Sequence, residues 1–239
     1  MDPNTEVSPV DLSRLPNLEG VFDLIYNPAR TRLLLQAEER GLYRANGLGM
    51  LVAQAKAAAE RFLNAAIPDD RVEEITAQME RETQNLLLIG MPGCGKTTVG
   101  QALTRRLGRP LVDTDALVVQ AAGCPIPELF AREGEEAFRA LEHQALCQAG
   151  RASGTIIATG GGIVTRRENW APMRENSTVI FLRRPLDQLP LDGRPVSQAN
   201  PLEELYQKRL PLYEKAADLT VDNDQVDRAA DEIIRRLKL

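Results

Sequence analysis

Residues 90–98 read Gly90-Met91-Pro92-Gly93-Cys94-Gly95-Lys96-Thr97-Thr98, and this stretch decides the fold. It matches the pattern G-x-x-x-x-G-K-[ST], which is typical of a loop that binds phosphate groups. The apolar run 85–90 before it is consistent with a buried strand, and residues 97–107 after it have helical character. Because the motif requires this context, a phosphate-binding loop is favoured over a chance glycine-rich turn.

The residue types in this loop suit phosphate chemistry. Glycines let backbone N–H groups turn inward around phosphates, and the helix that follows adds partial positive charge at its N-terminus. Lys96 is expected to reach the outer phosphates, and the hydroxyl of Thr97 is expected to bind Mg²⁺. The residues expected to contact the phosphates are Gly93, Cys94, Gly95, Lys96, Thr97 and Thr98.

Further short apolar runs follow the loop and alternate with segments of helical character. Such alternation is typical of a parallel sheet covered by helices on both faces. The sequence therefore predicts an α/β fold for residues 85–239, a length sufficient for one hydrophobic core. The expected strands are 85–90, 110–112, 155–159, 178–182 and 219–221, and the expected helices are 97–107, 127–148, 202–214 and 227–237.

Two polar or glycine-rich patterns come at the ends of expected strands. In Asp113-Thr114-Asp115, two acids at i and i+2 can point the same way across the mouth of the sheet, one toward a hydrated metal and the other toward an acceptor hydroxyl. The alternative is that Asp115 caps a helix. Gly160-Gly161-Gly162 would let the backbone approach a ligand closely, although a plain turn has the same composition.

In this order and spacing, the motifs of residues 85–239 resemble those of shikimate kinases over essentially the full length of this segment. Besides the patterns above, the resemblance rests on Ile126–Phe130 with Gly134–Glu142, on Gly193-Arg194-Pro195, and on Lys208–Tyr213. It implies the P-loop NTPase fold of small-metabolite kinases (nucleoside-monophosphate-kinase-like), with a five-stranded parallel sheet. It also implies ATP- and Mg²⁺-dependent phosphorylation of the 3-hydroxyl of shikimate, a step of chorismate and aromatic amino acid biosynthesis.

The resemblance implies a set of substrate-binding residues. Asp115 orients the shikimate hydroxyls and is the candidate base, while Arg139 and Arg209 bind the substrate carboxylate. The backbone of Gly160, Gly161 and Gly162 lines the pocket. This assignment agrees with the chemistry, since a small anionic polyol needs arginines for its carboxylate and an acid for its hydroxyls.

The resemblance also implies residues that act on ATP and the metal. Lys96 binds the transferring phosphate, and Arg194 reaches the same phosphate from a mobile lid around residues 190–199. Thr97 binds Mg²⁺, and Asp113 belongs to the water shell of the metal. Lys96, Asp115 and Arg194 are therefore the expected catalytic residues.

The segments on the adenine side depart from the family pattern. The usual arginine is not evident between Gln188 and Arg194, and residues 223–226 read Asn-Asp-Gln-Val where a basic stretch is usual. The preferred nucleotide therefore follows less directly from the sequence than the acceptor substrate does.

Residues 1–84 predict a mostly helical extension. Val21–Tyr26 is the one expected strand, and helices are expected at 30–40, 50–64 and 69–84. One strand and three helices cannot make a sheet of their own. We therefore expect this segment to be an appendage to the kinase domain at 85–239.

Residues 21–64 resemble the C-terminal end of shikimate dehydrogenases, through Asp23–Pro28 and Asn46–Ala55. In that family the positions of Tyr26 and Gln54 face the substrate and that of Met50 faces the nicotinamide. The catalytic Lys–Asp pair and the glycine-rich dinucleotide turn are absent from this chain. We therefore expect residues 1–84 to be a non-catalytic fragment and linker, either a relic or a segment for self-association or contact with a pathway enzyme.

Composition and charge exclude several classes of protein. The chain has 239 residues, 43% hydrophobic and 26% charged, which is ordinary for a globular protein. No apolar run approaches the roughly 18 residues of a membrane span, and the N-terminus lacks the apolar core of a secretory signal. The net charge is −5, so no nucleic-acid partner is expected. Three cysteines without a disulfide framework favour the cytoplasm.

Two other functions are compatible with parts of this pattern. A related small-metabolite kinase, such as a gluconate kinase, is disfavoured by the pair Arg139 and Arg209. A catalytically dead nucleotide-binding scaffold is disfavoured by the intact phosphate-transfer residues. The only histidine, His143, is expected to be an ordinary helical residue, so neither a Ser-His-Asp triad nor a multi-histidine metal site is expected.

Overall fold

The computed structural model describes residues 8–189 and 202–239. The chain forms two compact units, residues 1–84 and residues 85–239. The expected lid at 190–199, with Arg194, lies outside the described residues. In the described ranges, no helix combines the length and apolar character needed to span a membrane.

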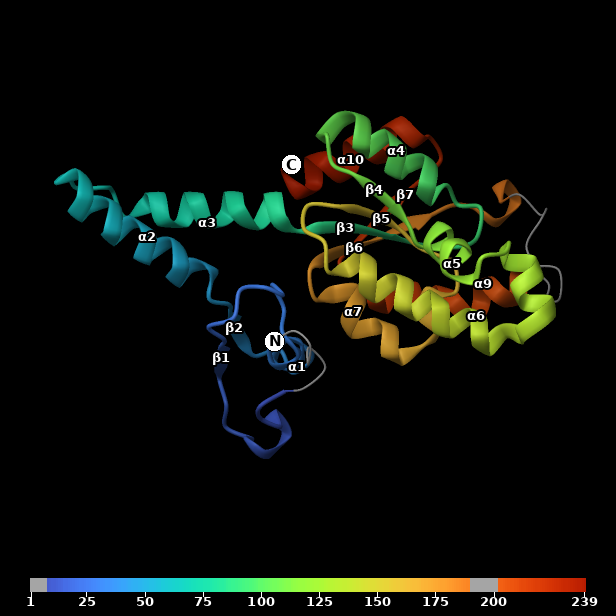
Figure 1. Ribbon diagram of the computed structural model, residues 1–239, viewed down its shortest axis with the longest axis horizontal. Coiled ribbons are helices and arrows are strands. Elements are labelled where there is room, and N and C mark those ends of the chain that lie inside the picture. Colours follow the sequence, from blue (N-terminus) through green and yellow to red (C-terminus); the bar gives the residue numbers. More distant parts are fainter. Residues whose placement is uncertain (1–7, 190–201) are drawn as a thin grey trace. The chain divides into compact units, whose positions relative to one another are not determined.

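The second unit is built on a five-stranded parallel sheet, as the sequence predicts (Figure 1). The strand order is β4-β5-β3-β6-β7, so the chain switches direction across the sheet at the central strand β3. In such folds the ligand site lies at the carboxyl end of the strands, beside this switch point. The strands are β3 (Asn85–Ile89), β4 (Leu111–Asp113), β5 (Ile156–Ala158), β6 (Ser177–Arg183) and β7 (Leu219–Asp222).

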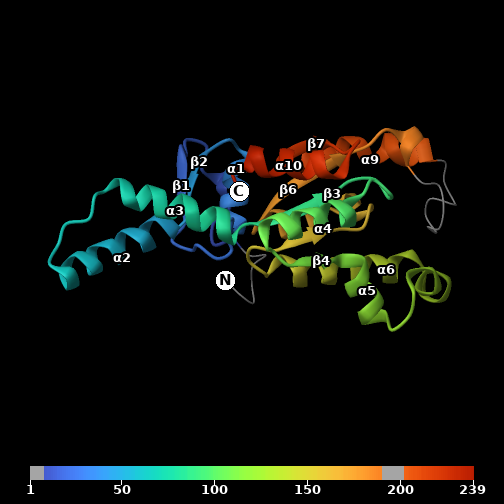
Figure 2. The same cartoon turned by 90° about the horizontal axis from the view of Figure 1, so that it is seen from above.

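Helices cover both faces of this sheet. Figure 1 shows α4 and α10 on one face and α7 and α9 on the other, and Figure 2 shows α5 and α6 on the β4 side. The long helix α6 bends at Gly134, whose φ of 82° is not helical. The helices are α4 (Lys96–Leu107), α5 (Thr114–Ala122), α6 (Ile126–Gly150), α7 (Trp170–Arg174), α9 (Leu202–Ala216) and α10 (Val226–Leu237), with short 3-10 turns η2 (Ile163–Thr165), η3 (Arg167–Asn169) and η4 (Leu186–Gln188).

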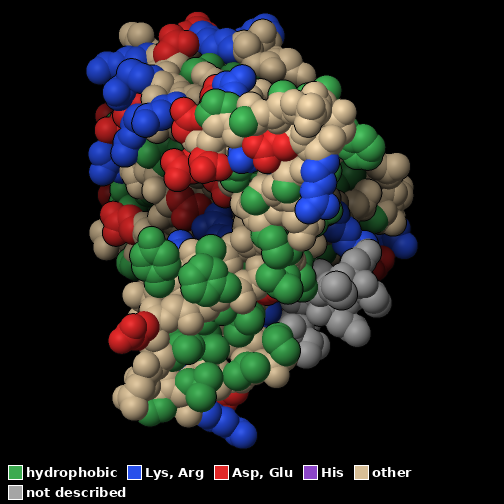
Figure 3. Space-filling view, turned by 90° about the vertical axis from the view of Figure 1, so that its left-hand side faces the viewer, with side chains coloured by type: hydrophobic (Ala, Val, Ile, Leu, Met, Phe, Trp, Pro, Cys, Tyr) green, Lys and Arg blue, Asp and Glu red, His purple; other side chains and the backbone are tan. Residues whose placement is uncertain are grey.

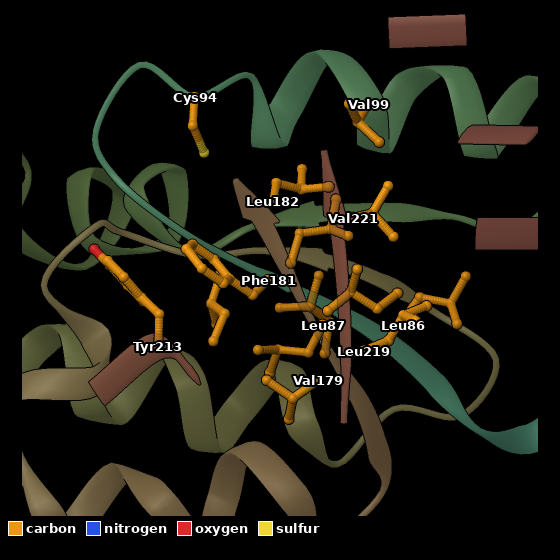
Figure 4. Close-up of a cluster of buried hydrophobic side chains, with 14 of the residues drawn as sticks. Leu86, Leu87, Cys94, Val99, Val179, Phe181, Leu182, Tyr213, Leu219 and Val221 are labelled. Atoms are coloured by element: carbon orange, nitrogen blue, oxygen red, sulfur yellow. The ribbon is translucent and has the colours of Figure 1, made fainter. Parts of the chain in front are cut away.

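The core lies between the central strands and these helices. Leu86–Ile89 are buried on both faces of the sheet, which is why this run is apolar without alternation. Leu87 pairs with Ile157 and Val179 on the neighbouring strands. The ring of Phe181 stacks on Tyr213 of α9 with centroids 5.1 Å apart (Figure 4). This stack connects the sheet to a helix that carries site residues.

The Asp-Thr-Asp segment differs from the expected strand end. The strand β4 stops at Asp113, and Thr114–Ala122 forms the helix α5, so a helix does begin here, as the alternative interpretation expected. Asp113 is the N-cap, since its carboxylate accepts a hydrogen bond from the backbone N–H of Asp115 at 3.0 Å. The alternative in which Asp115 is the cap is therefore wrong, and Asp115 lies in the first turn of the helix.

The first unit contains two strands where one was expected. β1 (Gly20–Phe22) pairs in parallel with β2 (Tyr43–Ala45), so the prediction that this segment makes no sheet of its own is wrong. The connection between them carries α1 (Arg32–Glu39), whose Leu34 and Ala37 pack on Leu12 and Val21. The other elements are η1 (Leu12–Arg14), α2 (Leu48–Leu63) and α3 (Asp70–Thr83).

Large apolar side chains are exposed on the first unit. The side chains of Phe22, Tyr43 and Phe62 are 75%, 77% and 90% exposed. Figure 3 shows hydrophobic side chains at the surface on the side turned to the viewer. A sheet of two three-residue strands has only one side covered by α1, which leaves its outer residues in contact with solvent.

Gly47 tests the packing of the first unit. A Cβ added at Gly47 would overlap the carbonyl group of Leu24, whereas one added at Gly49 would meet nothing within 4 Å. Because backbone must shift to admit it, Gly47→Ala should destabilise this unit by about 1–3 kcal/mol. Gly49→Ala, inside α2, is the control and should be neutral or stabilising by up to about 1 kcal/mol. Hydrogen exchange in α1 and α2 checks both variants, and equal protection would contradict the packing described.

Candidate active site

The phosphate-loop motif connects β3 to α4. Gly93 and Gly95 have φ values of 82° and 95°, a region that disfavours any side chain. From outside the loop, the buried side chain of Asn223 donates a hydrogen bond through Nδ2 to the carbonyl oxygen of Cys94, at 2.6 Å. This contact holds the loop against the β7 end of the sheet. The curled backbone leads into the N-terminus of α4, which favours an anion.

Lys96 is buried beneath the loop. Its ammonium donates to the carbonyl oxygens of Gly90 and Met91 at 2.9 and 3.0 Å. These are uncharged acceptors, and phosphate oxygens are stronger ones. The lysine is therefore held close to the loop by contacts that a bound phosphate can replace.

Thr97 and Asp113 meet at the mouth of the site. The hydroxyl of Thr97 donates to Oδ2 of Asp113 at 2.8 Å. Hydroxyl and carboxylate oxygens are ligands that Mg²⁺ accepts, and this metal commonly takes one or two protein groups together with water and substrate phosphates. The residues present therefore fit the implied ion.

Two carboxylates converge on the first glycine of the triple-glycine turn. A Cβ on Gly160 would overlap Oε1 of Glu142 and lie 2.9 Å from Oδ1 of Asp115. Burial raises the pKa of Glu142 above its usual range, although Arg139 opposes this shift. Oε1 of Glu142 has no hydrogen-bond partner among the described residues, so it is an acceptor that points toward the turn without a donor.

Arg139 lies across the third glycine of the turn. Its guanidinium donates to Glu142 at 2.7 Å and to Glu135 at 3.1 Å, and a Cβ on Gly162 would overlap it. Burial by itself would lower the pKa of Arg139, but the two glutamates outweigh burial and raise it. Arg139 is therefore a buried, fully charged group whose direction is fixed mainly by Glu142, since the side chain of Glu135 is 58% exposed.

Arg209 and Tyr213, on consecutive turns of α9, hold the middle glycine. Both donate to the carbonyl oxygen of Gly161, Arg209 at 3.3 Å and Tyr213 through its hydroxyl. Burial raises the pKa of Tyr213 above its usual range, so this hydroxyl keeps its proton and remains a donor. A Cβ on Gly161 would lie 2.6 Å from Cδ of Pro92, so the turn packs directly on the phosphate loop.

The structure brings most of the expected site residues together at the carboxyl end of the sheet. The expected substrate residues (Asp115, Arg139, Gly160, Gly161, Gly162 and Arg209) surround one glycine turn. The loop residues Gly93, Cys94, Gly95 and Lys96 lie beside it, and Thr97 and Thr98 are exposed in the first turn of α4. Arg194 lies outside the described residues.

Sequence reasoning missed three residues at this site: Glu142, Tyr213 and Asn223. For two of them, the sequence does contain a pattern that points to the site. Glu142 follows Arg139 by three residues and Tyr213 follows Arg209 by four, spacings that place each pair on one face of a helix. Asn223 lies in the segment 223–226, whose only departure from the family pattern in the sequence is its lack of basic residues.

A family model described as "Shikimate kinase" matches residues 92–238. The chain belongs to the shikimate kinase family. The match leaves out residues 1–84, so it does not address their resemblance to a dehydrogenase.

Proteins of similar sequence are also named shikimate kinases. The chain is 41% identical over 166 residues to a "Shikimate kinase" of Synechococcus sp. (strain CC9902), which covers 64% of this chain and 86% of that protein. It is 37% identical over 168 residues to a "Shikimate kinase" of Neisseria meningitidis serogroup C (strain 053442), covering 66% and 99%.

Solved structures share the fold. The shikimate kinase from Acinetobacter baumannii in complex with shikimate matches with a TM-score of 0.60 and 28% identity, covering 68% of this chain and 97% of that one. The shikimate kinase from Aquifex aeolicus matches with a TM-score of 0.57 and 31% identity, covering 64% and 96%. The fold is thus the P-loop NTPase fold, and the chain is a kinase that phosphorylates shikimate. The gluconate kinase and scaffold alternatives are not favoured.

Glu142 can be tested against Glu135, because both accept hydrogen bonds from Arg139. Glu142→Gln keeps the shape but removes the buried charge that directs Arg139. A charge-assisted hydrogen bond contributes roughly 1.5–3 kcal/mol, so we expect shikimate affinity to fall about tenfold or more. The exposed Glu135→Gln should change it less than about threefold. Titration with shikimate and separately with ATP checks this, and equal losses of shikimate affinity in the two variants would contradict the assignment.

Proposed function

We propose that residues 85–239 transfer the γ-phosphate of ATP, bound with Mg²⁺, to the 3-hydroxyl of shikimate, using the residues gathered around the triple-glycine turn. The observation that carries this is the turn itself, with two arginines and two carboxylates around it and the phosphate loop packed on Gly161. A small acid with several hydroxyls fits the charges of this cluster. Phosphoryl transfer needs such positioning more than covalent chemistry.

The substrate side of the proposal follows from charge. Arg139 and Arg209 bind the carboxylate of shikimate, since both are buried cations beside the turn. Asp115 accepts hydrogen bonds from the hydroxyls and takes the proton of the reacting one. Glu142 is a positioning residue that holds Arg139. The backbone of the glycine turn closes the pocket on the side of the phosphate loop.

On the nucleotide side, the N–H groups of Gly93, Cys94 and Gly95 and the first turn of α4 with Thr98 surround the phosphates. Lys96 exchanges its carbonyl partners for phosphate oxygens. Thr97 and Asp113 would hold Mg²⁺, which would supply charge neutralisation on the phosphate oxygens. Arg194, from the segment outside the described residues, completes the proposed set.

Lys96→Met tests the nucleotide half of the proposal. The variant removes the cation that neutralises charge on the transferring phosphoryl group, a contribution of about 10²–10³ in rate. We expect turnover to fall by at least this factor with the fold intact. Lys208→Met, at a lysine whose side chain is 72% exposed, is the control and should retain turnover. A coupled assay of ADP release checks both, and more than about a tenth of normal turnover in Lys96→Met would overturn the assignment.

Arg209→Ala tests the substrate half. The loss of a charge-assisted pair with the carboxylate should weaken shikimate binding by roughly 1.5–3 kcal/mol while leaving ATP binding nearly unchanged. The neighbouring Lys208→Ala, which points to solvent, should change neither. Separate calorimetric titrations of the two ligands give the comparison. A similar loss for both ligands in Arg209→Ala would exclude a carboxylate-binding role.

We propose that the first unit, residues 1–84, carries no chemistry of its own and serves as an attachment surface. The residues that match the dehydrogenase positions, Tyr26, Met50 and Gln54, are exposed. The exposed apolar side chains of this unit favour self-association or contact with another pathway enzyme.

The full chain should therefore show no NADP-dependent oxidation of shikimate. The sequence lacks both the dinucleotide turn and the Lys–Asp pair, so a hydride has no acceptor site. Spectrophotometric detection of NADPH checks this, with a complete shikimate dehydrogenase as the positive control. Oxidation that is detected and then lost in Met50→Ala would overturn the proposal.

A further inference from the structure

The only histidine of the chain joins a cysteine and an asparagine outside the substrate cluster. Nδ1 of His143 lies 2.7 Å from Oδ1 of Asn169, and Nε2 lies 3.6 Å from Sγ of Cys147. His143 and Cys147 occupy consecutive turns of α6, and Asn169 comes from η3. The histidine and the cysteine are partly exposed, whereas Asn169 is buried.

The hydrogen bonds fix which ring nitrogen of His143 carries the proton. Nδ2 of Asn169 donates to the carbonyl oxygen of Ile163 at 2.8 Å, so the amide oxygen must face the imidazole. An amide oxygen only accepts, and Nδ1 therefore carries the hydrogen. In the neutral ring Nε2 is then the basic nitrogen, and it faces the thiol of Cys147.

From this arrangement we propose that Cys147 is a modification site for small disulfides of the glutathione class, with His143 as its base and Asn169 as the residue that orients the base. The thiol proton passes to Nε2, and the Cys147 sulfur attacks one sulfur of the disulfide. A new S–S bond forms as the old one breaks. The departing half leaves as a thiolate, which takes a proton from the imidazolium or from water.

The other two cysteines do not share these features. Cys94 is fully buried within the phosphate loop. Cys124 is partly exposed, as Cys147 is, but the single imidazole of the chain faces Cys147. Cys124 is therefore a matched internal control with comparable access and no histidine base.

The same residues connect Cys147 to the glycine turn. Asn169 holds the carbonyl of Ile163, whose own N–H donates to the carbonyl oxygen of Gly160 at 3.3 Å. A group attached to Cys147 displaces the imidazole and frees Asn169, which loosens the support of the turn. This consequence rests on the proposed shikimate pocket, and modification should therefore raise the KM for shikimate several-fold with little change in ATP affinity.

The test uses the full chain treated with oxidised glutathione, with mass spectrometry of each cysteine-containing peptide over time. We expect Cys147 to react at least about tenfold faster than Cys124 at neutral pH. His143→Gln should remove this advantage. Rates in urea give the reference for each thiol, and unchanged ATP affinity shows that the variant is folded.

Each outcome decides one step. Equal rates at the two cysteines in the native protein, a measurement that needs no variant, would overturn the modification site. A Cys147 rate that is unchanged in His143→Gln would overturn the role of the base. Cys147→Ser should protect the KM for shikimate from glutathione treatment; if modified wild-type protein keeps its KM, the connection to the turn is wrong. None of these labelling results depends on the proposed roles of Arg139 or Arg209.

Discussion

The carbonyl oxygen of Gly161 is the point at which the parts of the site meet. Arg209 and Tyr213 donate to it from α9, and the phosphate loop packs on its α-carbon through Pro92. A side chain here, or at either neighbouring glycine, would collide with the loop, with Glu142 or with Arg139. The close approach of these groups therefore depends on three consecutive residues without a Cβ. We expect this constraint to set the distance between the proposed acceptor substrate and the phosphates.

Burying Arg139 and Glu142 is costly, and the pair is not there for stability alone. Removing two charges from water costs several kcal/mol per ion, and their attraction repays this only with good geometry. The raised pKa of Glu142 reflects that cost. The pair orients Arg139. Without Glu142, the long side chain of Arg139 would have to lose rotamer entropy to hold its guanidinium in one direction. A positioned cation beside an open glycine turn suits a ligand that brings its own carboxylate.

Features of the fold that depend on local sequence patterns were predicted correctly. Features that depend on contacts with residues distant in sequence were not predicted. The strand, loop and helix around Gly90–Thr98 follow from chain-local patterns. The parallel sheet follows from apolar runs that alternate with helical segments, and its five strands were implied by the family resemblance. The sequence offered Asp115 as a possible helix cap, but the cap is Asp113, whose carboxylate accepts from the backbone N–H of Asp115. The strand β2 was missed, because three residues carry no periodicity. Glu142 and Tyr213 belong to the site through tertiary contacts, and only helical spacing hinted at them.

The hydrogen bonds of the phosphate loop are made within the loop and with Asn223, and they bear on how a nucleotide would bind. Lys96 donates to Gly90 and Met91, and the Cys94 carbonyl is held by Asn223. The left-handed glycines and the Asn223 contact involve backbone that phosphates do not need to move. The Lys96 contacts involve a flexible side chain, which bound phosphates do need to move. We therefore expect the loop to bind phosphates as a preformed cradle in which only the Lys96 ammonium changes partners, so that little ordering is needed.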